Sequence, residues 1–229
     1  MPHLTMLAIE TSQRRGEVAL REASGRVHEE ALATRDRHDD DLLPAIDRVC
    51  ARAGVRALDL EAVAVSVGPG GFTGLRIAVA TAKGLAEAIG ARLVAVPSAL
   101  VAAASIAPPA ARAHVILASK GESCWLTTVV RTGARWTIEG EPGLVDAGAI
   151  ALDGIDVVCG DRFTPEALRA RCDAGAVPLV EPVFGAAACL AEASARWSAG
   201  VVTDALRLSP VYAREPEAVT LWRLRHGIQ

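Results

Sequence analysis

The sequence contains few aromatic residues, almost no lysine and no large excess of charge of either sign. Aromatic residues make up 3% of its 229 positions, and Lys83 and Lys120 are its only lysines. The 24 basic and 27 acidic side chains give a formal net charge of −3. Because affinity for nucleic acids depends strongly on neutralised phosphates, the chain as a whole has no field that attracts a polyanion. We therefore expect any RNA to be held by a partner protein.

The sequence also lacks the cysteine and histidine patterns of metal-binding proteins. Its five cysteines are odd in number, widely spread and include no Cys-x-x-Cys pair, which argues against a disulfide framework and a zinc site. None of its five histidines has another at the i, i+4 spacing of a helical metal site. These features predict a protein of the reducing cytoplasm that binds no metal.

No stretch of the sequence predicts a signal peptide or a membrane span. The apolar run at the N-terminus reaches only Glu10, which is too short for a signal-peptide core and its cleavage site. Residues 93–111 carry no charge, but three prolines interrupt them, so they predict a buried strand and a helix. We therefore expect a cytoplasmic protein with no membrane contact.

The sequence does contain two successive runs of strand and helix patterns, and 51% of its residues are hydrophobic, enough for a large core. The first run predicts strands at 6–11, 17–21, 27–32, 62–67 and 93–96, and helices at 41–53, 73–89 and 98–106. The second predicts strands at 115–118, 124–130, 135–138, 157–159 and 177–180, and helices at 146–152, 164–172 and 186–197. We expect an α/β protein with a lobe at 1–107, a smaller lobe at 108–200 and a tail at 201–229.

The most informative stretch is a glycine-rich turn between a predicted strand and a predicted helix. Backbone amides at such a turn point outward, and the dipole of the following helix favours an anion. The candidate phosphate-site residues are Gly68, Pro69, Gly70, Gly71, Thr73 and Arg76. The turn matches neither standard nucleotide-binding pattern. The alternative is that the glycines only permit a tight turn.

The helix after this turn carries a stripe of small residues, so a second helix could approach it closely. Together with the helix at 41–53 it could form an apolar face. That face either packs in the core of the protein or contacts a partner. The candidate contact residues are Leu42, Leu43, Ile46, Val49, Leu75, Ala78, Val79 and Ala82.

Few other residues suggest chemistry. Glu10, followed by Thr11 and Ser12, could hold a hydrated magnesium ion in a cleft or lie at a solvated strand end. Neither a Gly-x-Ser-x-Gly turn nor a cysteine in a nucleophile pattern is present, so no catalytic residue is predicted. The tail ends with residues that could contact RNA, contact a partner or remain in solvent: Arg223, Arg225 and His226.

These residues resemble the bacterial TsaB family of tRNA threonylcarbamoyladenosine biosynthesis proteins, in the sugar-kinase/Hsp70/actin-like superfamily. Segments 68–77 and 80–86 are close to the family's GPGSFTGLRIG and ATAKGLA patterns. Shorter matches lie at 7–12, at His38, and at 42–44, 97–100 and 210–214. The resemblance implies two ribonuclease H-like lobes, of which the second is reduced.

The sequence departs from the family pattern in several places. Glu10 stands where aspartate is common, Gly71 replaces a serine, and Asp39 replaces another helix-capping residue. Residues 118–122 replace an Asp-Ala-Arg-x-x-Glu stretch, which weakens the case for an ATP site in this chain alone. In the catalytic paralogue TsaD a His-x-x-x-His metal pair follows the corresponding strand, whereas residues 98–103 offer one hydroxyl among apolar side chains.

The resemblance therefore implies a non-catalytic scaffold. Such a chain pairs with TsaD through the two-helix face, recruits the ATPase TsaE and supports threonylcarbamoyl transfer to adenosine 37 of tRNAs that read ANN codons. It contacts tRNA indirectly, forms a homodimer when alone and has no cofactor of its own, with ATP or ADP expected at the interface with TsaD.

Two alternatives to the scaffold remain open. A small ATP-dependent kinase or ATPase of the same superfamily would use residues 10–12 in the cleft between the lobes. A glycoprotease-like peptidase has the least support, because no nucleophile, metal pair or activated water can be assembled from these residues.

Overall fold

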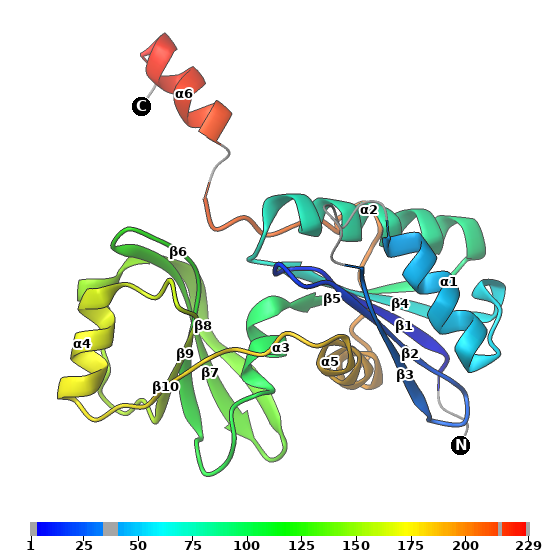
Figure 1. The fold of residues 1–229 in the computed structure, drawn as a ribbon, viewed down its shortest axis with the longest axis horizontal. Helices are drawn as coiled ribbons and strands as arrows, with labels where there is room; N and C mark the ends of the chain where they lie inside the picture. The colour runs from blue at the N-terminus through cyan, green and yellow to red at the C-terminus, as the bar shows by residue number, and fades with distance from the viewer. Residues whose placement is uncertain (1–3, 34–40, 215–216, 228–229) are drawn as a thin grey trace.

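A computed structural model describes residues 4–33, 41–214 and 217–227, and it contains two five-stranded sheets (Figure 1). The first sheet has the order β3-β2-β1-β4-β5. Its strands are β1 (Met6–Glu10), β2 (Glu17–Arg21), β3 (Val27–Ala31), β4 (Ala62–Gly68) and β5 (Arg92–Pro97). β1 pairs antiparallel with β2 and parallel with β4. Every residue of β1 and β4 is buried, as expected for central strands that are covered on both faces.

The second sheet has the order β10-β9-β6-β7-β8. Its strands are β6 (Arg112–Lys120), β7 (Ser123–Thr132), β8 (Arg135–Asp146), β9 (Val157–Gly160) and β10 (Leu179–Val180). β6 pairs antiparallel with β7 and parallel with β9, so β6 to β10 repeat the order and directions of β1 to β5. The expected α/β fold of two similarly wound lobes is confirmed.

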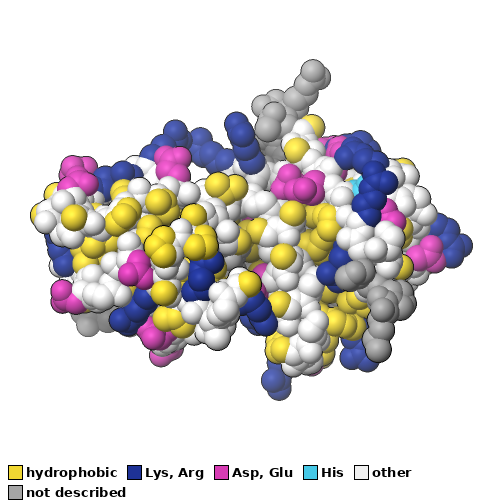
Figure 2. Space-filling view, turned by 90° about the horizontal axis from the view of Figure 1, so that it is seen from below, with side chains coloured by type: hydrophobic (Ala, Val, Ile, Leu, Met, Phe, Trp, Pro, Cys, Tyr) yellow, Lys and Arg dark blue, Asp and Glu magenta, His cyan; other side chains and the backbone are white. Residues whose placement is uncertain are grey.

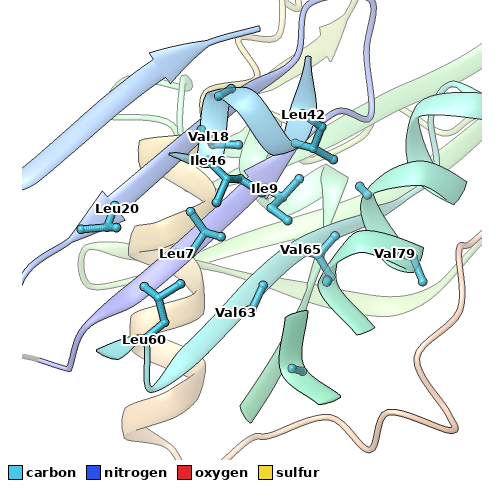
Figure 3. Close-up of a cluster of buried hydrophobic side chains, with 14 of the residues drawn as sticks. Leu7, Ile9, Val18, Leu20, Leu42, Ile46, Leu60, Val63, Val65 and Val79 are labelled. Atoms are coloured by element: carbon cyan, nitrogen blue, oxygen red, sulfur yellow. The ribbon is translucent and has the colours of Figure 1, made fainter. Parts of the chain in front are cut away.

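Helices cover both faces of the first sheet. α1 (Leu42–Ala53) and α2 (Phe72–Ile89) lie on one face, where they pack on the larger side chains of β1 and β4, such as Leu7, Ile9 and Val65 (Figure 3). α5 (Ala186–Ser198) lies on the other face, where the strands present mainly alanine. Side chains alternate between the faces of a strand, so β1 separates these two cores. No helix among the described residues has the length and hydropathy needed to cross a membrane.

Two helices link the lobes by packing across them. α3 (Ser98–Ala103) follows the first sheet and packs between the two sheets, with Val101 in the core of the first and Leu100 in the core of the second. α5 follows the second sheet but packs against the first. α4 (Glu166–Ala174) covers the outer face of the second sheet. The boundaries at residues 107 and 200 stay a prediction, and α5 crosses from the second lobe to complete the core of the first.

One predicted helix is wrong. Instead of a helix at 146–152, β8 continues to Asp146 and is followed by a single 3-10 turn at Ala147–Ala149. The Asp146 side chain accepts a hydrogen bond of 2.8 Å from Gly148 N, which stabilises this turn in place of a helix. β8 is therefore much longer than the predicted strand at 135–138. The predicted helix cap Asp39 and the family position His38 lie outside the described residues.

The C-terminal strap, residues 201–214, packs along the first lobe, and α6 (Glu217–His226) follows it. Thr203 N donates to Leu93 O over 2.8 Å, and Leu208, only 2% exposed, lies in the core formed with α1 and α2. In Figure 1 α6 lies clear of both lobes. Part of the expected tail therefore belongs to the core of the first lobe.

The strap offers a matched pair of leucines that tests this packing. Leu208→Ala should lower the free energy of unfolding by about 2–5 kcal/mol, because it leaves a cavity in the core. Leu206, which is 92% exposed, should change it by less than about 0.5 kcal/mol when replaced by alanine. Urea denaturation of both variants measures the difference. Equal effects would contradict the placement of the strap.

Candidate functional site

The glycine-rich turn joins β4 to α2 and lies directly on the end of β1. Gly71 N donates to Ser12 O over 2.7 Å, and Thr11 Oγ1 donates to Gly74 O over 2.9 Å. A Cβ on Gly70 would lie 2.2 Å from Ser12 O, and one on Gly74 would lie 2.3 Å from Thr11 O. Only glycine permits this approach of backbone to backbone.

The C-terminal strap covers the other side of the same turn. Val211 N donates to Val67 O over 2.7 Å, and a Cβ on Gly68 would lie 2.5 Å from Val211 O. Gly68 also has a φ of +106°, which favours glycine. These contacts show that close packing of the backbone is enough to require glycine at these positions, in agreement with the interpretation that the glycines permit a tight turn. The phosphate-site hypothesis stays a prediction, and the Gly71 amide is already bound to Ser12 O.

Glu10 is fully buried beneath this turn. Its Oε1 accepts a hydrogen bond of 2.7 Å from Ser12 N, whereas its Oε2 and the buried Ser12 hydroxyl have no hydrogen-bond partner among the described residues. Burial raises the pKa of the Glu10 carboxyl, because the charged form is poorly solvated there. Within the described residues, no group of three His, Cys, Asp or Glu side chains is placed to hold a metal.

A cavity of about 890 Å³, the interlobe cavity, lies between the lobes. Gln13 and the residues that follow it line the cavity, but Glu10, Thr11 and Ser12 do not. All three are buried, because the glycine-rich turn packs over them, so the expectation of a solvated strand end is wrong. The expectation that they form a nucleotide cleft stays a prediction.

The charges that line the interlobe cavity are balanced. Its ionisable residues are three arginines and four carboxylates: Arg14, Arg15, Arg162, Glu17, Glu29, Asp161 and Glu181. Glu17 Oε2 accepts a hydrogen bond of 2.7 Å from Ala186 N at the start of α5. The chain's own carboxylate thus lies at a helix N-terminus that would otherwise favour an anion.

The strap also joins the two lobes at the hairpin between β6 and β7. The Arg214 guanidinium donates to Ala118 O, to Ser123 O over 2.9 Å and to Ser123 Oγ over 2.8 Å. Ala118, which has a φ of +51°, and Ser119 line the interlobe cavity. The segment at 118–122 that departs from the family pattern is thus held by an arginine from the C-terminal strap.

The predicted contact residues of the two-helix face are corrected by their burial. Seven of the eight are at most 5% exposed and pack within this chain: Leu42, Ile46, Val49, Leu75, Ala78, Val79 and Ala82. Only Leu43, at 59%, is exposed. The apolar stripe is buried against the chain's own sheet, because both helices need it to cover β1 and β4 (Figure 3). These seven side chains are therefore not available to a partner.

The side of α2 that faces solvent is instead lined by small residues. We name it the outer α2 face. Its small exposed residues are Thr73, Ala80, Gly84 and Ala88, and the larger Phe72, Arg76 and Glu87 are exposed on the same helix. Apart from the backbone of the helix itself, no atom of the described residues lies within 4 Å of a Cβ built on Gly84. Small side chains on an exposed helix face allow another helix to approach closely.

Beside this face, Arg76 is held by two aromatic rings. Its Cζ lies 4.0 Å from the centroid of the Phe72 ring, and its Nε donates to Tyr212 OH over 3.0 Å. The two rings are 4.9 Å apart and are tilted by 36°. Residue patterns suggested Arg76 as a phosphate ligand but did not suggest Tyr212; the match at 210–214 was the signal that could have found it.

A family model described as "TsaD: tRNA N6-adenosine threonylcarbamoyltransferase" matches residues 27–141, half of the chain. The chain is 39% identical over 97 residues to the tRNA threonylcarbamoyladenosine biosynthesis protein TsaB of Haemophilus influenzae, covering 42% of this chain and 40% of that protein. It is 30% identical over 161 residues to the tRNA N6-adenosine threonylcarbamoyltransferase of Erythrobacter litoralis, covering 66% of this chain and 45% of that protein. The chain thus spans less than half the length of these relatives.

A solved structure, YeaZ from Pseudomonas aeruginosa, resembles the fold with a TM-score of 0.77 and 24% sequence identity. The similarity covers 92% of this chain and 100% of that chain. At this identity the likeness supports the fold alone.

Two glycines of α2 provide a matched test of the packing at the turn. Gly74→Ala should lower the free energy of unfolding by about 1–3 kcal/mol, because the added methyl group meets the Thr11 carbonyl. Gly84→Ala should raise it by about 0.5–1 kcal/mol, because the methyl group meets nothing and alanine favours the helix. Thermal or urea unfolding measures both. A stable Gly74→Ala variant would refute the close approach.

The buried carboxyl of Glu10 should make stability depend on pH. Because its pKa is raised in the folded chain, the folded state binds more protons than the unfolded state from the ordinary value of 4.5 up to the raised value. Its contribution to the free energy of unfolding therefore falls as pH rises through that window. Glu10→Gln keeps an acceptor for Ser12 N and should gain stability relative to the parent chain over this range.

Urea denaturation between about pH 4 and pH 8 measures this difference. Asp59→Asn is the control, because Arg56 lowers the pKa of the exposed Asp59 carboxyl below its ordinary value of 3.8, so the difference between this variant and the parent chain should stay nearly constant over the same pH range. A difference between Glu10→Gln and the parent chain that does not change with pH would contradict the burial of an ionisable carboxyl.

Proposed function

Because the chain belongs to the TsaD family of tRNA N6-adenosine threonylcarbamoyltransferases and has relatives named TsaB, we propose that it is a TsaB-type scaffold subunit. In this proposal it pairs with TsaD, recruits TsaE and supports threonylcarbamoyl transfer to adenosine 37 of tRNAs that read ANN codons. The chemistry takes place on TsaD, and this chain contributes surfaces for assembly.

The observation that carries the proposal is the outer α2 face. Thr73, Ala80, Gly84 and Ala88 are small and exposed there, and Gly84 in the middle of the helix has open space where a side chain would be. Glycine inside a helix costs about 1 kcal/mol relative to alanine, so its presence at an exposed position favours a role in close packing against another chain.

TsaD is the partner that this face suits best. The family model matches residues 27–141, which include both α1 and α2, so a TsaD chain is expected to carry equivalent helices. Two chains with related surfaces can pair about a pseudo-twofold axis, and two copies of this chain can pair in the same way when TsaD is absent.

Three contacts within this chain, made by residues in or near the interlobe cavity, support a role other than catalysis. Glu10 is turned inward, Glu17 binds the start of α5, and Arg214 binds the carbonyls of the β6–β7 hairpin. ATP or ADP is accordingly proposed at the interface with TsaD and not in this cavity.

We propose that tRNA binds mainly to the partner, TsaD. On the face of the molecule shown in Figure 2, lysine and arginine side chains lie scattered among acidic and apolar ones. Affinity for RNA rises with the number of phosphates that a surface neutralises together.

Substitutions on the outer α2 face test the proposal. Gly84→Arg and Ala80→Arg should each weaken binding to TsaD from the same organism by at least about tenfold, because a long charged side chain prevents close helix packing. Co-purification and the mass of the intact complex measure binding, and reconstituted threonylcarbamoyladenosine formation should fall in parallel.

Ala170→Arg is the matched control, because Ala170 is an exposed helical alanine on α4 of the second lobe. It should leave binding unchanged. Val79 is unsuitable for this test, because it is 5% exposed and a charge there would destabilise the fold. Unchanged co-purification of both α2 variants with TsaD would contradict the proposed interface.

A further inference from the structure

Arg76 differs from the arginines of α1, because aromatic rings hold it and no carboxylate among the described residues pairs with it. On α1, Arg48 pairs with Asp41 and Glu30, and Arg52 also pairs with Glu30. Arg76 is exposed, and within the part of the chain that the structure describes its contacts are the Phe72 and Tyr212 rings and the Tyr212 hydroxyl.

These contacts hold the guanidinium by one face and one edge. The Phe72 ring lies 4.0 Å from Cζ, and Tyr212 OH accepts the hydrogen bond from Nε. The Tyr212 backbone is itself fixed, because Val211 N binds Val67 O on one side and Arg214 binds the second lobe on the other. The two terminal nitrogens make no hydrogen bond within the described residues and remain available as donors.

We propose that Arg76 is a preformed fork that binds an aspartate or glutamate side chain of the chain docked on the outer α2 face. This inference rests on the proposed function, in which that chain is TsaD. A planar guanidinium donates two parallel hydrogen bonds to a carboxylate. Stacking on a ring leaves these in-plane donors free, and fixing the side chain before binding reduces the entropy lost on binding.

The position of Arg76 places this fork at the edge of the proposed interface. Arg76 precedes Ala80 by four residues, so the two side chains are neighbours on the helix surface. Phe72, whose ring lies against the guanidinium, is 40% exposed, and Val211, the neighbour of Tyr212 in the chain, is 37% exposed, so the site includes apolar surface that a partner could bury. Arginine and aromatic residues are enriched among the residues that dominate binding energy.

A single carboxylate suits this site better than a phosphate group. Phosphates of nucleotides and RNA carry more charge and are usually bound by several cations together. The chain has only two lysines, and Lys83, on the same helix, lies seven residues beyond Arg76. One guanidinium among aromatic and apolar side chains therefore matches one negative charge.

The test compares the affinity of the full chain for TsaD across conservative variants. Arg76→Lys keeps the charge but loses the fork, and it should weaken binding by about 30-fold, the scale of a dominant interface residue. Tyr212→Phe keeps the ring but removes the acceptor for Nε, and it should weaken binding by a smaller factor. Titration calorimetry measures each affinity, and thermal unfolding confirms that both variants fold.

Arg162→Lys is the matched control. Arg162 is also exposed and lies 4.8 Å from the ring of Phe163, but it belongs to the second lobe. Its replacement should leave the affinity for TsaD within about twofold. Amide replacements of carboxylates on TsaD should then identify one whose effect is not additive with that of Arg76→Lys.

The outcomes separate this inference from the proposed function. If the parent chain binds TsaD and Arg76→Lys binds equally well, the fork is refuted while the scaffold proposal stands. If the effect of Arg76→Lys occurs only when ATP or tRNA is present, the ligand is a phosphate and the carboxylate is refuted. If the parent chain does not bind TsaD, both proposals fall.

Discussion

The structure depends on one close approach of backbone to backbone, where the first turn of α2 lies on the loop that follows β1. Gly70 and Gly74 meet the carbonyl oxygens of Ser12 and Thr11, where any Cβ would overlap them. This contact sets the position of α2 over the first sheet, so its apolar stripe is buried and its small residues face outward. It also encloses Glu10, which explains why that carboxyl lies in the core and not in the interlobe cavity.

The C-terminal strap extends this constraint to the second lobe. Leu208 fills the core beside α2, Val211 packs on the glycine-rich turn, and Arg214 binds the hairpin between β6 and β7. The same segment supplies Tyr212, which holds Arg76 beside the outer α2 face. The C-terminal strap thus stabilises the first lobe, holds the two lobes together and positions the arginine that we propose binds a partner.

The helices and strands that depend on local sequence patterns were predicted well. The alternating and helical periods placed α1, α2 and the strands of the first sheet within a few residues, because such periods depend only on neighbouring positions. The helix expected at 146–152 failed because strand pairing with β7 extends β8 to Asp146, and that pairing is not local. The contact residues on α1 and α2 failed for a similar reason, since the most apolar stripe of each helix was taken up by the chain's own sheet.

Four features could be read from the residues alone: the α/β class, the repeated order of elements, the glycine positions at the turn and the resemblance to a family. Each of these features depends on a short stretch of neighbouring residues. Other features depend on the three-dimensional packing: α5 covers the first sheet, Glu10 is enclosed, small residues lie on the outer α2 face, and Arg76 contacts Tyr212, 136 positions away in the chain. The physical reason is that periodicity identifies an apolar face, whereas the segment that covers this face is set by packing between residues far apart in the chain.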